Sequence, residues 1–396
     1  MNNNNTTYHP LGDYIRPVDV RNRDLKVTTL LGLSIEKCFI PSIANTIGTD
    51  MSTYKVVMPG QFAYGPVTSR NGDKITIALY TGDEPAIISQ AYSVFEIVGE
   101  CDTVETRRAT SLQLLPEYLM MWFRRPEFDR YARYHSHGSA REIFDWAEMC
   151  ATMVPVPPIS EQRAVVADYE AVARRISVAK RTIATLQATA QTLYRKMFVD
   201  GIDKENLPEG WRWGTLGDFG EIVTGKTPST LDETNFGGPI PFVTIPDMHD
   251  KYYVFETERT LSIKGADSQK NKMLPPNTIC VSCIGTSGLV VITTQRCQTN
   301  QQINSILLKE QNSLCYLYLL LSNMGKLIGE YGLGGAVLNN LNKADFENLK
   351  AIIPSKTDLQ KFHETAMPIF SNIRLQQQEI EKLTEIQSLL LARMGK

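Results

Sequence analysis

Hydrophobic residues recur with helical spacing in two long stretches of this chain. In the first, from about Ile159 to Val199, apolar or small residues follow one another at alternating steps of four and three. These residues are Val165, Tyr169, Val172, Ile176, Ala179, Ile183, Leu186, Ala190, Leu193 and Met197. The second stretch has the same spacing at Phe362, Ala366, Ile369, Ile373, Gln376, Ile380, Leu383, Gln387, Leu390 and Met394. Heptad spacing sustained this long predicts two helices that pair as an antiparallel coiled coil.

The two stretches belong to an internal repeat. Shifting the chain by 197 residues aligns its second half with its first, without a gap, for about eighty positions. A further anchor, at an offset of 205, aligns Leu11-Gly12-Asp13-Tyr14 with Leu216-Gly217-Asp218-Phe219. Between the anchors the halves have little in common. A fixed frame around variable inserts predicts two similar modules that do the same job on different targets.

The sequence ahead of each long helix predicts a mixed α and β module. Short β-rich runs lie at Thr53–Met58, Lys74–Tyr80, Ala86–Ser89, Val94–Val98, Pro241–Ile245, Thr278–Cys283, Val290–Thr293 and Ile303–Lys309. A helix is predicted next in each module, over Pro116–Tyr134 and Cys315–Tyr331. We therefore predict an α+β fold in which two long antiparallel coiled-coil helices join two globular modules, with a pseudo-twofold internal repeat. The predicted boundaries are 1–157 and 201–354 for the modules, and 158–200 and 355–396 for the helices.

Composition is that of a soluble protein with two domains. The chain has 396 residues, of which 42% are hydrophobic and 21% charged. No apolar run reaches the ~18 residues of a membrane span, and the start of the chain lacks the features of a secretion signal. Seven cysteines, an odd count, argue against a disulfide framework. We expect a cytoplasmic protein with no membrane partner.

Charge limits how this chain could hold nucleic acid. The net charge is −2, and acidic side chains slightly outnumber basic ones in both predicted modules. Neither module is a basic clamp, so attraction to phosphates alone cannot hold DNA tightly. Residues 107–141 nevertheless contain seven arginines among interleaved aromatic residues. We predict a helix there whose arginine face looks toward phosphate, with Trp122 and Phe123 in the core.

Two motifs suggest other chemistry. Gly220–Thr227 matches the nucleotide-binding P-loop pattern, which needs a strand before it and a helix after it. Pro228 and the residues after it leave no room for that helix, so a P-loop nucleotide hydrolase is an alternative of low weight. Cys280 and Cys283 have the spacing of zinc ligands but lie in an apolar run, which predicts buried structural cysteines. We predict no metal site and no catalytic residues in this chain.

Several short segments, in a specific order, carry a family resemblance. They are Gly60–Tyr64, Ile88–Phe95, Val156–Gln162, Leu207–Trp211, Gly225–Ser229, Pro241–Val243 and Thr299–Ile303. Together they resemble the specificity subunit of type I restriction-modification systems, over nearly the whole chain. The chain departs from the family pattern in two places. The first module has no Trp-bearing entrance, and the second helix begins after Pro354 with Ser355-Lys356-Thr357-Asp358.

The resemblance implies that the modules are target-recognition domains, each reading one half of a bipartite sequence in double-stranded DNA. The helix pair would set the spacer between the halves and dock two methyltransferase (modification) subunits, with restriction/translocase subunits outside them. S-adenosylmethionine, ATP and Mg would then be bound by those partners, which flip out and methylate an adenine. The alternative from another class of protein is a coiled-coil structural scaffold without a DNA role.

Polar residues on predicted loops are the candidates for reading base edges. In the first module they are Tyr64, Arg70, Gln90, His137, Ser139 and Arg141. In the second module they are Lys226, Thr227, Thr244, Asp247, Thr286, Asn300 and Gln301. Asn300 and Gln301 have an equal alternative role, which is to cap a turn.

Overall fold

The structure is a computed structural model that describes residues 7–42, 48–69, 72–98, 113–138, 141–331 and 341–395. The chain forms two compact units. Unit 1 consists of Met1–Arg175 and Leu383–Lys396, and unit 2 of Ile176–Lys382. Both units mix helices and strands, and each contains part of both long helices. The mixed class and the long helices agree with the prediction.

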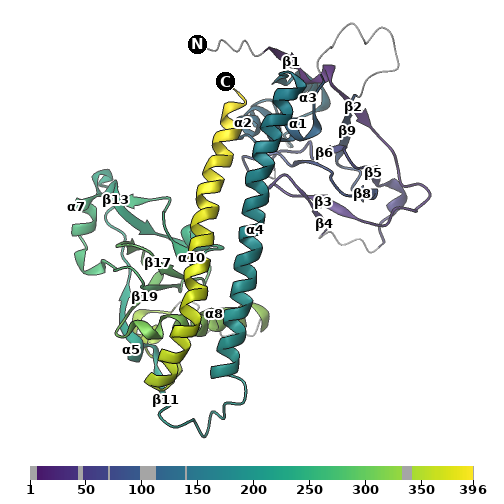
Figure 1. Cartoon of the computed structure of the whole chain (residues 1–396). Coiled ribbons are helices and arrows are strands. Elements are labelled where there is room, and N and C mark those ends of the chain that lie inside the picture. The colour runs from purple at the N-terminus through teal and green to yellow at the C-terminus, as the bar shows by residue number, and fades with distance from the viewer. Residues whose placement is uncertain are drawn as a thin grey trace. The chain divides into compact units, whose positions relative to one another are not determined.

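The long helices are α4 (Ile159–Phe198) and α10 (Lys356–Arg393), teal and yellow in Figure 1. With 40 and 38 residues, at ~1.5 Å per residue, each is roughly 60 Å long. The helix α10 continues through Pro368. In unit 2 the aromatic rings of Tyr194 and Phe198, near the end of α4, pack against Phe362, near the start of α10. This contact places the two helices antiparallel within the unit.

The internal repeat is visible in matching strand pairs. In unit 1, β1 (Tyr8–Pro10) pairs antiparallel with β10 (Met153–Pro155), which immediately precedes α4. In unit 2, β11 (Arg212–Thr215) pairs in the same way with β20 (Lys350–Ile353), which precedes α10. The registers also correspond, since Tyr8 lies opposite Pro155 and Trp213 opposite Ile352. Each module is therefore closed by the strand that leads into a long helix.

Two glycines show why the short anchor motif recurs. Gly12 follows β1 and Gly217 follows β11, each in a single helical turn. A Cβ at Gly12 would lie 2.9 Å from the Cβ of Cys150, and one at Gly217 would lie 2.8 Å from Cγ of Glu347. Cys150 and Glu347 are themselves related by the offset of 197. At both positions the repeated anchor thus lies so close to the equivalent residue that a side chain could enter only if its neighbour moved.

Unit 1 contains a four-stranded antiparallel sheet in the order β2-β9-β6-β7, with two further strand pairs, β3-β4 and β5-β8. These strands are β2 (Ile15–Val18), β3 (Leu31–Leu33), β4 (Phe39–Pro41), β5 (Lys55–Val57), β6 (Phe62–Tyr64), β7 (Ile77–Leu79), β8 (Ala86–Ile88) and β9 (Ser93–Ile97). The helices that cover the core are α1 (Pro116–Phe123), α2 (Pro126–Tyr134) and α3 (Trp146–Ala151). The sequence predicted one helix over Pro116–Tyr134. It is two helices because Pro126 keeps Arg125 extended, with ψ 137°.

Unit 2 contains a five-stranded sheet in the order β12-β19-β16-β17-β14 and a three-stranded sheet in the order β15-β13-β18. Its strands are β12 (Gly220–Thr224), β13 (Phe236–Val243), β14 (Tyr253–Val254), β15 (Thr260–Leu261), β16 (Ile279–Ser282), β17 (Val290–Thr293), β18 (Gln298–Thr299) and β19 (Ile303–Leu308). Its shorter helices are α5 (Leu216–Phe219), α6 (Ile245–Met248), α7 (Ile263–Asp267), α8 (Leu314–Tyr331) and α9 (Lys343–Glu347).

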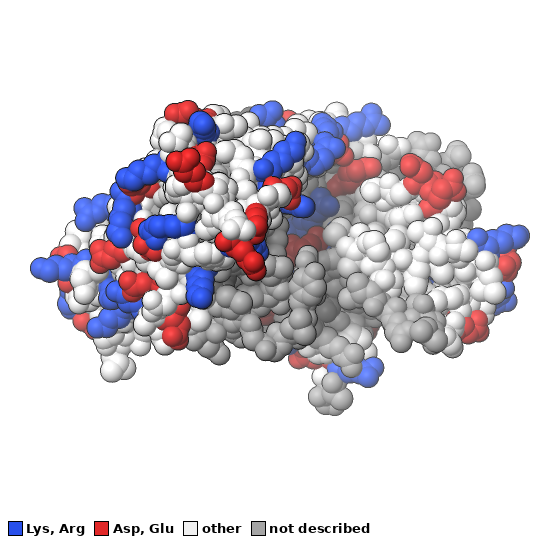
Figure 2. Space-filling model, turned by 90° about the horizontal axis from the view of Figure 1, so that it is seen from below, with Lys and Arg blue, Asp and Glu red and all other residues white. Residues whose placement is uncertain are grey.

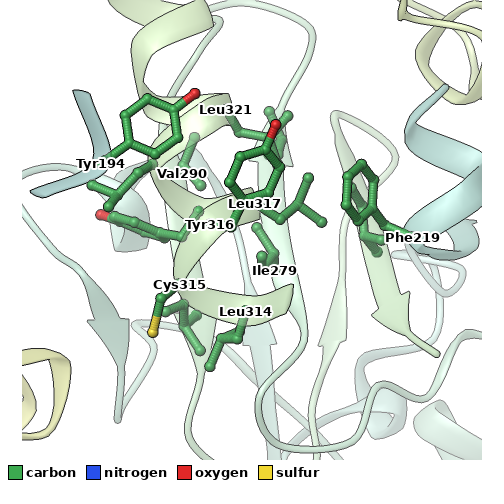
Figure 3. Close-up of a cluster of buried hydrophobic side chains, with 14 of the residues drawn as sticks. Tyr194, Phe219, Ile279, Val290, Leu314, Cys315, Tyr316, Leu317 and Leu321 are labelled. Atoms are coloured by element: carbon green, nitrogen blue, oxygen red, sulfur yellow. The ribbon is translucent and has the colours of Figure 1, made fainter. Parts of the chain in front are cut away.

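The helix α8 packs on the five-stranded sheet and forms the main core of unit 2 (Figure 3). Leu317 and Leu321 from α8 meet Ile279 and Val290 from the sheet, and all four are buried. Tyr194 of α4 joins the same cluster. The long helix is therefore part of the module's core, so a change in the helix acts directly on the module.

Candidate nucleic-acid interface

Two loops of unit 2 meet at one polar edge of the module. Lys226 N–H donates to the Thr299 carbonyl at 2.9 Å, and the Thr227 hydroxyl donates to Gln301 Oε1 at 2.7 Å. A Cβ on Gly225 would overlap the carbonyl oxygens of Thr299 and Asn300, so only glycine allows this approach. Lys226, Thr227, Asn300 and Gln301, which the sequence singled out separately, thus lie together.

The two amide residues of this edge have different roles. Asn300 Oδ1 accepts from the Gln302 N–H at 3.1 Å, and its Nδ2 donates to Gln302 Oε1 at 3.0 Å. Both ends of this amide serve the turn, which favours the capping role that the sequence left open. Gln301 is exposed, and its Oε1 accepts from Thr227, while its Nε2 forms no hydrogen bond with any residue that the structure describes. Gln301 can therefore offer a donor to a base without disturbing the turn.

Thr286 belongs to the same edge, in the exposed loop between β16 and β17. Cys283 N–H, at the start of that loop, donates to the Gln302 carbonyl at 2.8 Å. A Cβ on Gly285 would be 3.4 Å from Gln302 Nε2, so the loop lies beside the 299–303 turn. We call Lys226, Thr227, Thr286 and Gln301 the unit 2 polar edge.

Thr244 and Asp247 have a structural role that the prediction did not foresee. Asp247 is 6% exposed, and its Oδ2 accepts from the N–H and the hydroxyl of Thr244, both at 2.8 Å. Its Oδ1 accepts from the Glu258 N–H at 2.8 Å. Both carboxylate oxygens accept hydrogen bonds that cap α6 and hold Glu258, and the side chain is buried, so Asp247 does not present its carboxylate to a base.

Lys270, which the sequence analysis did not select, lies next to Lys226 of the polar edge. Gln269 Nε2 donates to the Lys226 carbonyl at 2.6 Å, and Gln269 directly precedes the short turn Lys270–Lys272. Lys270 is exposed, and within the described residues neither it nor Lys226 forms an ion pair. The Lys-Asn-Lys triplet at 270–272 was the only sequence feature that could have pointed to Lys270, and such a triplet by itself indicates an ordinary solvated turn. Both lysines could contact phosphates beside the edge.

Tyr64 is a core residue in unit 1. Its side chain is 1% exposed and lies edge-on to Phe95, with ring centroids 6.2 Å apart. Burial raises the pKa of Tyr64 to about 12. The prediction placed Tyr64 on a loop, but it lies on β6, between the two neighbouring strands of the sheet. Its ring therefore has no surface to present to a base.

The other unit 1 candidates are exposed where they can be described. Gln90 lies in the turn between β8 and β9, and Arg141 is exposed. Arg141 lies two residues before Ile143, whose backbone groups exchange hydrogen bonds of 3.0 and 2.9 Å with those of His137. Arg70 and Ser139 lie outside the described residues. Gln90 and Arg141 thus remain predicted contacts.

The carboxylate of Glu148 contacts both His135 and His137. Glu148 Oε2 is 3.1 Å from Nδ1 of His135, and its Oε1 is 3.2 Å from Nε2 of His137. The ring of His135 also lies against Tyr131, with centroids 4.2 Å apart. Among the described residues no His, Cys, Asp and Glu cluster has the geometry of a metal site. We read Glu148 as a support that fixes His137 beside Arg141.

The arginine-rich segment is less basic than its sequence suggested. Arg125 is buried and packs over the Trp122 ring at 4.2 Å. Arg133 forms a 2.6 Å ion pair with Glu142, and Arg130 lies 3.5 Å from Glu127. On the face of the molecule shown in Figure 2, blue and red side chains are intermixed and form no continuous basic stripe. These pairs partly neutralise the face that was predicted to look toward phosphate.

The P-loop alternative fails on geometry. Gly220–Thr224, the first part of the motif, is the strand β12, paired residue by residue with β19. A phosphate loop needs these residues to curl around an anion with their N–H groups free. After Thr227, the next helical element is a single turn, Glu233–Asn235. Gly220–Thr227 therefore matches the P-loop pattern in sequence but does not adopt the P-loop structure.

Cys280 in β16 and Cys283 just after it are buried, as their position in an apolar run predicted, and they lie in separate cores. Cys280 belongs to the cluster around Val243 and Val291, while Cys283 belongs to the main core beneath α8. Burial raises the pKa of the Cys280 thiol to about 12 and that of Cys283 to about 11. Both are therefore neutral, unreactive thiols near neutral pH.

We expect selective thiol alkylation. In the native protein, iodoacetamide should modify Cys38, which is exposed, and leave Cys280, Cys283 and Cys315 intact until the chain unfolds. Because the folded pKa values of these buried thiols are raised, the stability they contribute is present at neutral pH and is lost as pH rises toward 11. Peptide mass spectrometry before and after denaturation measures this. Rapid native modification of Cys280 would contradict the assigned burial.

Parts of this chain are similar to known proteins. Residues 208–385 match the family model described as "Type I restriction modification DNA specificity domain". The chain is 39% identical over 216 residues to the type I restriction enzyme HindI specificity subunit of Haemophilus influenzae, which is 53% of this chain and 47% of that protein. It is 27% identical over 176 residues to the MjaIX specificity subunit of Methanocaldococcus jannaschii, which is 43% of this chain and 40% of that one.

The chain thus spans about half the length of the curated relatives it matches. The similarity in fold covers more of the chain than the similarity in sequence. The crystal structure of a type I restriction-modification system S subunit from M. genitalium covers 100% of this chain and 97% of its own, with a TM-score of 0.60 at 13% identity. In the described residues, no helix is both long and apolar enough to cross a membrane. Residues 208–385 thus match the type I restriction modification DNA specificity domain, and the whole chain has the fold of the M. genitalium S subunit.

Proposed function

We propose that this chain reads a bipartite DNA sequence for a type I restriction-modification complex. Each module reads one half of the target, and the helix pair sets the spacer and docks two methyltransferase subunits. Restriction/translocase subunits join outside them. The observation that carries the proposal is the repeat itself. One frame, with equivalent strand registers and equivalent long helices, presents two different sets of polar loops.

Readout would use donors that the fold leaves available. In unit 2 these are Gln301 Nε2, the Lys226 ammonium and the Thr286 hydroxyl, all on the unit 2 polar edge. A lysine suits the guanine O6 and N7 acceptors, and a single amide donor suits one purine acceptor. In unit 1 the corresponding donors are Arg141, Gln90 and His137. The two edges differ in chemistry, which suits two different half-sites.

The chemistry of the complex is assigned to partners. The chain would be non-catalytic, with S-adenosylmethionine on the methyltransferase subunits and ATP and Mg on the restriction/translocase subunits. The net charge of −2 supports this division. A chain this close to neutral gains little affinity from counterion release, so basic surfaces of the partners would supply much of the hold on phosphates.

Methylome sequencing with and without this chain tests the proposal. In cells that carry the chain and its neighbouring methyltransferase, we expect methylated adenines in one motif with two specified halves and a fixed gap. Deleting the chain should remove that motif, and restoring it should bring the motif back. A coiled-coil scaffold without a DNA role would leave the methylome unchanged, which would end the proposal.

A further inference from the structure

We propose that two buried glutamines, Gln162 on α4 and Gln377 on α10, fix where each recognition module sits on its long helix and thereby set the accuracy of the spacer. This inference rests on the proposed function. The glutamines are positioning residues, because neither has an exposed amide that could meet DNA.

Gln377 completes the edge of the five-stranded sheet in unit 2. The strand β14 lies at the end of that sheet, and among the described strands it pairs with β17 alone. On its open side, Gln377 Oε1 accepts from the N–H groups of Tyr252 and Tyr253, both at 3.0 Å, and Nε2 donates to the Tyr253 carbonyl at 2.5 Å. The side-chain amide thus takes the place of a peptide group in a neighbouring strand, and this place belongs to the helix α10.

Gln162 makes a similar connection in unit 1. Its side chain is fully buried, and Oε1 accepts from the Leu115 N–H at 2.9 Å. Its Nε2 donates to the carbonyls of Gln113 and Pro157, at 2.7 and 2.8 Å. Leu115 is the residue from which α1 begins. The first turn of α4 therefore holds the start of the helix that covers the unit 1 core.

Hydrogen bonds of this kind can fix a position that apolar packing leaves soft. Apolar burial is non-directional, so a module could turn or slide a little on its helix at low cost. A hydrogen bond weakens steeply outside a narrow range of distance and angle. Adjacent base pairs differ by ~3.4 Å along the duplex. Holding a module in register with its half-site therefore needs directional contacts as well as apolar area.

The two connections are not copies of each other within the repeat. At the offset of 197, Gln162 corresponds to Leu359 and Gln377 corresponds to Lys180. Leu359 is buried and has no side-chain amide, and Lys180 is exposed on α4. The frame is shared, but each module carries its own polar connection at its own position. Changing one connection should therefore affect the placement of one module only.

The test is a change of Gln377 to Met, which keeps the side chain's length and removes its hydrogen bonds. The full complex with its methyltransferase subunits would be titrated with duplexes whose gap is the native one or is one base pair longer or shorter. We expect the preference for the native gap to fall about tenfold in Q377M, as the loss of buried hydrogen bonds of this strength implies.

The matched control is Gln378→Met, one residue further on the same helix, where the side chain has no hydrogen bond within the described residues. Thermal unfolding of each variant separates placement from folding. A variant whose affinity falls by the same factor for every gap, so that the native preference is intact, shows a purely structural role and overturns the inference. An unchanged preference in a folded Q377M also overturns it. If the wild-type complex prefers no bipartite duplex, it is the proposed function that fails.

Discussion

Removing one heptad from each long helix should shorten the gap between the two half-sites by up to about three base pairs. Seven residues at ~1.5 Å each shorten a helix by roughly 10 Å, and base pairs are ~3.4 Å apart. Seven residues are close to two full turns, so the faces of each helix rotate by only ~20°. Suitable segments are 171–177 in α4 and 379–385 in α10, because neither contains a buried side chain. Methylome sequencing reads the new gap directly.

The matched control removes the heptad from α4 alone. The helices then differ in length by two turns, and their apolar positions no longer face each other at both ends. We expect that variant to lose methylation of the motif without gaining a shorter one. If the double deletion folds and methylates the original motif with the original gap, the helix pair does not set the spacer.

The long helices and the repeat were predictable because their signals are local and redundant. Heptad spacing over ten positions and a shared offset leave little room for error, and α4 begins at Ile159 as the pattern indicated. The division of the Pro116–Tyr134 helix into two could also have been predicted, because a proline such as Pro126 disfavours a helical conformation at the residue before it. Apolar residues flank it on both sides, however, and the helical period continued across the break.

The roles of single polar residues were not predictable, because a sequence does not say which way a side chain faces. Asp247 and Tyr64 have the chemistry of base readers, but one caps α6 and the other lies in a sheet core. The glutamines show the opposite error. The pattern drew attention to Gln376 as a polar seam residue, whereas its neighbour Gln377 is the buried one. Only the meeting of α10 with the distant β14 gives Gln377 a role.

Exchanging residues 202–354 for the same segment of another specificity subunit should change one half of the target and leave the other half as it was. The unit 2 polar edge lies entirely inside this segment, while the unit 1 candidates lie outside it. The two compact units support independent behaviour, because unit 2 contains its own sheets and its own core. Methylome sequencing of the chimera gives both half-sites at once. A change in both halves would contradict independent modules.

The choice of boundary adds a second, finer expectation. The segment 202–354 carries Tyr252 and Tyr253 but leaves Gln377 behind on the recipient's α10. A chimera that exchanges 176–382 moves the whole compact unit, including the helix residues that complete its core and the amide that completes its sheet. We expect both chimeras to read the new half-site, and the longer exchange to hold the gap more strictly. If both chimeras hold the gap between the half-sites equally strictly, Gln377 acts only in folding. The proposal that each module reads its own half-site would not be affected.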